Sequence, residues 1–186
     1  VLHDEAVGLP VAAPDGTHWY VTTQAEGDET YTLVRTTVGG GTPEVVATDV
    51  ASGIGGCGFP MSPRATTGLM LAPGDARATF LRRVPGATAF HVLDLATGHV
   101  SLDGTTPGEA FCVGYSPDGA HLVVGTQQAD GTHHDIAPLP GGPFRALVTI
   151  PGPGLQGIRF SADGTKYVLA LQNGDVREHW VGTFAT

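Results

Sequence analysis

The residues able to do chemistry are few in this chain, and its two cysteines are the most informative. Cys57 and Cys112 are the only cysteines among 186 residues. An even cysteine count is typical of proteins that fold in an oxidising compartment, where thiols pair. A bridge between the two would close a loop of about 55 residues and add about 3 to 4 kcal/mol of stability. We therefore expect a disulfide and an extracytoplasmic location; the alternative is two buried thiols in a cytosolic protein.

The histidines are the next candidates, because imidazole is a common metal ligand. The chain has eight, and His133-His134-Asp135 is their one dense cluster. Adjacent residues of a strand point to opposite faces, so His133 and His134 would not bind one ion together. The sequence also lacks a His-Glu-x-x-His motif. We expect no metal and no cofactor, although a zinc site assembled from distant loops stays open as an alternative.

No residue is assigned a catalytic role. The sequence has no Gly-x-Ser-x-Gly motif, so an esterase-type serine has no visible position. Two carboxylates for glycoside hydrolysis need not be close in sequence, and no specific pair is indicated. The pattern favours a protein without catalytic activity, and an enzyme remains the alternative.

The elements that would position these residues come from an internal repeat. A turn segment starts at Pro14, Pro73, Pro117 and Ala162, and in three of the four copies Asp-Gly follows directly. The last two intervals are about 45 residues, and an insertion lengthens the first. Pro, Asp and Gly each favour a tight turn, so apolar stretches on both sides predict a hairpin. His18, Arg77, His121 and Lys166 hold one repeat position, which favours a structural role for the two histidines.

Two further strands are expected in each repeat. Third strands are predicted at Tyr31–Thr36, Phe90–Leu95, Asp135–Leu139 and Val176–Val181, and fourth strands at Glu44–Ala47, His99–Leu102 and Phe144–Ile150. Four strands per repeat predict an all-β fold, a β-propeller with four four-stranded blades. As one domain over 1–186, the blades would cover roughly 10–69, 70–112, 113–157 and 158–186, with residues 1–9 adding a strand. A sandwich with hairpins that look alike by chance is the alternative.

Tyr115-Ser116-Pro117-Asp118-Gly119 and Asp94-Leu95-Ala96-Thr97-Gly98 resemble segments of the WD40-like repeats in TolB-type propellers. Such blades also occur in the propeller domains of prolyl-oligopeptidase-like proteins. The resemblance implies a propeller that binds proteins, sugars or peptides, or that gates an enzyme. Families of this kind usually have six to eight blades, whereas four are counted here. The chain is therefore expected to form a small closed ring, to self-associate, or to be part of a longer propeller.

Charge and hydropathy exclude several classes of partner. The formal net charge is -9 and Lys plus Arg number 9, without a basic cluster. Phosphate recognition needs clustered positive charge, so we expect no nucleic-acid binding. No apolar run approaches the roughly 18 residues that would cross a bilayer, so we expect no membrane insertion. No signal peptide is recognisable in the sequence, which starts at Val1.

The insertion in the first repeat, Asp49 to Gly68, is where we expect function, because an inserted segment is not needed by the repeat. Its Phe59, Met61 and Arg64 are candidate contacts for a protein or peptide partner. We therefore predict a secreted or cell-envelope scaffold that binds a protein. The alternatives are a propeller of, or gating, an extracellular hydrolase and a carbohydrate-binding propeller. Trp19 and Trp180 occupy different repeat positions, which disfavours a sugar platform in each blade.

Overall fold

The structure is a computed structural model and describes residues 10–51, 55–56, 65–66, 69–72, 74, 76–139, 141–150, 155–173 and 176–183. Its elements over this part of the chain are all β-strands, so the predicted all-β class is confirmed. Among the same residues, no helix has the length and apolarity needed to pass through a membrane.

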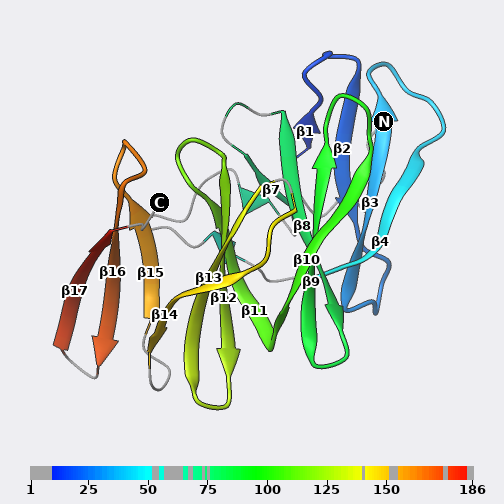
Figure 1. Cartoon of the computed structure of the whole chain (residues 1–186). Helices are drawn as coiled ribbons and strands as arrows, with labels where there is room; N and C mark the ends of the chain where they lie inside the picture. The colour runs from blue at the N-terminus through cyan, green and yellow to red at the C-terminus, as the bar shows by residue number, and fades with distance from the viewer. Residues whose placement is uncertain are drawn as a thin grey trace.

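The strands follow one another in four groups along the chain (Figure 1). The first group holds β1 (Val11–Ala12), β2 (His18–Thr23), β3 (Thr30–Thr37) and β4 (Glu44–Ala51). The second holds β7 (Leu69–Leu71), β8 (Arg77–Val84), β9 (Ala87–Asp94) and β10 (Val100–Pro107). The third holds β11 (Glu109–Tyr115), β12 (His121–Gln128), β13 (Gly131–Pro138) and β14 (Arg145–Ile150), and the fourth β15 (Leu155–Phe160), β16 (Lys166–Asn173) and β17 (Val176–Thr183).

Within each group, sequential strands pair antiparallel. The first two groups belong to one nine-stranded sheet, in which the described strands of the two groups pair at a single position, Val50 of β4 with Arg82 of β8. Two short strands lie between these groups along the chain, β5 (Gly55–Gly56) and β6 (Ala65–Thr66). The repeated unit is therefore a small antiparallel sheet, which is the architecture predicted for a blade.

The predicted third and fourth strands agree with β3, β9, β13, β17, β4, β10 and β14 to within a few residues. The third and fourth groups begin at Glu109 and Leu155, slightly before the predicted blade starts at 113 and 158. The blade boundaries themselves stay a prediction. The predicted N-terminal strand at 1–9 lies outside the described residues, and the number of blades in a complete ring stays a prediction.

The same backbone hydrogen bond closes the repeat turn in all four copies. In each, a backbone N–H at the start of the turn donates to a carbonyl five residues on. These bonds join Ala13 to His18 (2.9 Å), Ala72 to Arg77 (2.9 Å), Ser116 to His121 (3.0 Å) and Ser161 to Lys166 (2.9 Å). The four residues that share a repeat position thus close the hairpin through their backbones. The backbones of His18 and His121 thus take part in the repeat turn, and a structural role for their side chains stays a prediction.

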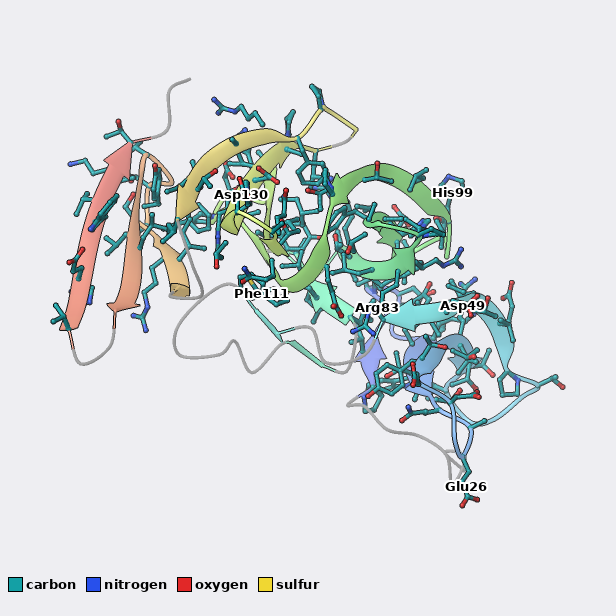
Figure 2. All side chains as sticks on the ribbon, turned by 90° about the horizontal axis from the view of Figure 1, so that it is seen from below. Glu26, Asp49, Arg83, His99, Phe111 and Asp130 are labelled. Atoms are coloured by element: carbon teal, nitrogen blue, oxygen red, sulfur yellow. The ribbon has the colours of Figure 1, made fainter. Side chains whose placement is uncertain are left out.

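Three hydrophobic clusters lie between successive groups and hold them face to face. The first joins Tyr20 and Leu33 to Phe80, and the second joins Phe90 to Val124. The third cluster consists of Cys112, Val123, Ile136, Ile158 and Leu169. Figure 2 shows the four groups following a curve, with Phe111 and Arg83 on its inner side and His99 on its outer side. Packing of repeated sheets along a curve is how propeller blades surround an axis.

We expect Tyr20→Phe to lower the free energy of unfolding by about 1 to 2 kcal/mol, because it leaves a buried carbonyl without its donor. Tyr20 is fully buried, and its hydroxyl donates to the Leu95 carbonyl of the second group at 3.0 Å. Tyr31→Phe is the matched control, because Tyr31 is only half-buried. Urea unfolding measures both variants. Equal effects of the two substitutions would contradict a specific contribution of this contact between the groups.

Candidate functional site

The inserted segment meets the third group at one edge of its sheet. Gly55 and Gly56 of β5 pair in parallel with Cys112 and Val113 of β11. The strand order is β14-β13-β12-β11-β5, so β5 covers the side of β11 that faces away from β12. We call this side, from Glu109 to Tyr115, the β11 edge. The inserted segment follows the first group in the chain, but its strand β5 pairs with the third group and not with the second.

Phe111 stands out on this edge. The register between β11 and β12 shifts between Ala110 and Cys112, so Phe111 is the extra residue of an irregularity. Such bulges re-aim a side chain relative to its neighbours in the strand. The Phe111 ring is 37% exposed and lies edge-on to His134 at 5.8 Å between centroids. Phe111 is not recognisable as a site residue from the sequence, because an alternating strand pattern carries no signal for a register shift.

Behind Phe111 is a closely packed cluster around Gly125 of β12. The sulfur of Cys112 lies 3.9 Å from His134 Nε2, and His134 is fully buried. A Cβ atom at position 125 would lie 2.6 Å from Cys112 Sγ and 2.7 Å from the Phe111 ring. Only glycine leaves room there, because real Cβ contacts are longer than this. The cluster therefore fixes the position of the β11 edge from behind.

Burial also sets the protonation state of this cluster. It lowers the pKa of His134 to about 4, since a charged imidazole loses its hydration inside the protein. His134 Nδ1 has no hydrogen-bond partner among the described residues. His134 is therefore neutral near pH 7, and it fills space between the third group's strands.

The two histidines of the cluster point to opposite faces of β13, as predicted from strand alternation. His134 points into the core, whereas His133 is partly exposed and lies 2.7 Å from Asp130 and 3.3 Å from Thr149. Asp135 lies on the same face of β13 as His133. No group of three metal-ligating side chains comes together within the described ranges.

Two of the serines are tied into repeat turns. Ser116 Oγ donates to Asp118 at 2.5 Å and accepts the His121 N–H at 2.9 Å. Ser161 makes the same bond to Asp163, and these hydrogen bonds hold the pKa of Asp163 at about 2. Both hydroxyls are thus committed to stabilising the hairpin turn.

The predicted partner contacts Phe59, Met61 and Arg64 lie outside the described residues, as does Cys57. The Cys57–Cys112 disulfide stays a prediction, but the described strands bear on it. Gly55, which pairs with Cys112, is two residues before Cys57. Two extended residues span only about 7 Å, so the chain can bring the two cysteines together.

No protein-family model and no curated protein matches this chain. Solved structures do match it. TolB from Acinetobacter baumannii is 16% identical, with a TM-score of 0.54 over 96% of this chain and 41% of that protein. A putative TolB from Agrobacterium tumefaciens is also 16% identical, with a TM-score of 0.55 over 89% of this chain and 54% of that protein. Oligopeptidase B from Leishmania major is 16% identical, with a TM-score of 0.65 over 98% of this chain and 25% of that protein.

The repeated sheets, their curve and these neighbours define the chain as a β-propeller. The predicted resemblance to TolB-type propellers is confirmed at the level of the fold. The chain spans about half or less of each of these proteins, and the identities are too low to carry over an activity.

Proposed function

We propose that this chain is an extracytoplasmic, non-enzymatic propeller scaffold that binds a protein or peptide at the β11 edge and the adjoining insertion. The observation that carries the proposal is the pairing of Gly55 and Gly56 with Cys112 and Val113. It joins the one long insertion to the strand that exposes Phe111. An exposed aromatic ring supported from behind by a rigid cluster is a favourable anchor for a protein interface.

The location outside the cytoplasm rests on the expected Cys57–Cys112 disulfide. Such a bridge would tether the inserted segment to the β11 edge. A tethered segment loses less conformational entropy when a partner binds, so the disulfide would also support affinity. The absence of catalytic activity rests on the sequence, together with the engagement of Ser116 and Ser161 in turns.

A hydrolase-associated role is the second candidate, and the likeness to oligopeptidase B favours it. This chain would then act as a propeller beside a separate catalytic unit. A screen of the purified chain against peptide and glycoside substrates tests whether the chain itself is catalytic. The identity of a captured partner distinguishes the two candidates, because the second predicts that this partner is a hydrolase. Turnover that survives further purification would contradict the non-enzymatic scaffold.

We expect Phe111→Ala to weaken partner binding by about tenfold or more, because truncating a central aromatic anchor removes much of the interface energy. The partner is first captured with a photoreactive amino acid at position 59 and identified by mass spectrometry. Its affinity for the wild-type chain and for each variant is then measured by calorimetry.

Trp180→Ala is the matched control, because Trp180 is a 53% exposed aromatic on β17, in a different group. It should leave the affinity unchanged. Deletion of 53–61 should abolish binding while the far-ultraviolet circular dichroism stays that of a folded propeller. If this deletion binds the partner as tightly as the wild type does, the site assignment is wrong.

A further inference from the structure

A hollow of about 490 Å³ lies between the second and third groups, and none of its described lining residues belongs to the β11 edge. Its walls come from β10, the end of β12, β13 and the turn before β14. The residues that line it include Thr106, Gln128, His133, Asp135, Pro143 and Phe144. Pockets of this volume are in the range that binds small molecules or single side chains.

The apolar wall is held firmly in place. The ring of Phe144 packs on Phe90 with 5.0 Å between centroids. Gly104, which has a φ of +154°, also lies against this ring, and a Cβ at position 104 would be 3.0 Å from one of the ring atoms. The backbone of β10 can approach this closely because position 104 has no side chain. The ring therefore offers a preformed surface for an apolar or delocalised group.

The polar wall carries one carboxylate. Asp135 Oδ2 accepts a hydrogen bond from the buried hydroxyl of Thr106 at 3.1 Å, which fixes the group across the junction between β10 and β13. Asp135 Oδ1 has no hydrogen-bond partner among the described residues. Both ring nitrogens of His133 contact other groups, Asp130 and Thr149. The described lining residues include no lysine or arginine, so none of them balances the charge of the carboxylate with a permanent cation.

A second hollow of about 240 Å³ shows how a similar junction is filled from within. It lies between the first and second groups and is lined by Arg35 and Glu44, among others. The guanidinium of Arg35 reaches across it to the Thr97 carbonyl at 3.5 Å. There the chain supplies its own cation next to a carboxylate. At the Asp135 junction the carboxylate is present, and no lysine or arginine is among the described lining residues.

We propose that the Asp135 hollow binds the guanidinium group of an arginine side chain presented by a protein or peptide. The planar cation would donate to Asp135 Oδ1 and stack on the face of Phe144, and the amide of Gln128 offers a further polar contact. The net charge of -9 favours the approach of a basic partner. This site is separate from the β11 edge, so its failure would leave the proposed function untouched.

The test is a titration of the isotope-labelled chain with N-acetyl-arginine-N-methylamide, followed through the amide signals of Thr106 and Asp135. We expect saturable shifts at these residues. The neutral isostere, the corresponding citrulline derivative, should bind about tenfold more weakly or worse, because it keeps the shape and loses the charge. Equal binding of the two compounds, or no shift at millimolar concentrations, would overturn the proposal. Free arginine that binds much more tightly than the capped form would contradict a protein-borne side chain.

Asp135→Asn tests the carboxylate itself, since asparagine keeps the size and can still accept from Thr106. The affinity for the capped arginine should fall about tenfold or more, to that of the citrulline derivative for the wild type. Asp28→Asn is the control, because it removes an exposed carboxylate of the β2–β3 loop and should change nothing. A thermal melt of each variant reports folding. A folded Asp135→Asn protein that binds the probe like the wild type does would also overturn the proposal.

Discussion

Reduction of the chain under native conditions is expected to lower its free energy of unfolding by about 3 to 4 kcal/mol, the largest single effect predicted here. The cause is the loop of about 55 residues that a Cys57–Cys112 bridge would close in the unfolded chain. The described pairing of Gly55 with Cys112 holds the chain two residues before Cys57 beside Cys112. Urea unfolding with and without a reductant measures the difference.

Cys57→Ala supplies the control for this experiment. It should lose the same stability as the reduced wild type, and a reductant should then have no further effect. Cys112→Ala is less informative, because Cys112 is buried beside His134 and its loss also leaves a cavity. Two titratable thiols in the unfolded, unreduced wild-type chain would show that the cysteines do not pair.

The second large effect is on the pH dependence of stability. His134 has a pKa of about 4 in the folded chain because of burial, against about 6.5 for an exposed histidine. The unfolded chain therefore binds an extra proton between these values. The contribution of the neutral imidazole is complete above about pH 6.5 and is lost as the pH falls toward 4. We expect a loss of about 2 kcal/mol between pH 7 and pH 5.

His134→Leu should remove most of this loss, because an apolar side chain of similar size does not titrate. Part of it should remain, because burial and then the neighbouring Arg82 lower the pKa of His91 as well. His99→Gln is the control, as His99 is exposed and lies on the outer side of the curve (Figure 2). Urea unfolding at the two pH values checks all three proteins. An unchanged loss in His134→Leu would show that another group is responsible.

Much of the fold could be predicted from the sequence, because the repeat presents the same local signal four times. The turn residues Asp118 and Asp163 mark the hairpins, and their carboxylates bind the turn backbone. Alternation within β13 correctly separated His133 from His134. These features depend on neighbours in sequence, so short-range rules were sufficient to find them.

Features that depend on distant contacts were not found. Two glycines have little strand propensity, and their partners in β11 lie about 55 residues away, so β5 gave no signal. In the sequence, Phe111 looks like any other strand residue, and only the register shift between β11 and β12 sets it apart. The Asp135 hollow is formed where two groups meet, and Thr106 and Asp135 become neighbours only in the folded chain. Asp135 itself was noticed, but only as part of the histidine cluster.

The measurement that tests the central claim most directly is a hydrogen-exchange footprint of the chain with and without its captured partner. The scaffold proposed here predicts slower exchange on binding at 109–115 and across the insertion 49–68. Exchange in β17 should not change, although Trp180 and Val181 are exposed there. Protection confined to β17 or to the outer strands β4, β10 and β14, with the β11 edge unaffected, would contradict the account.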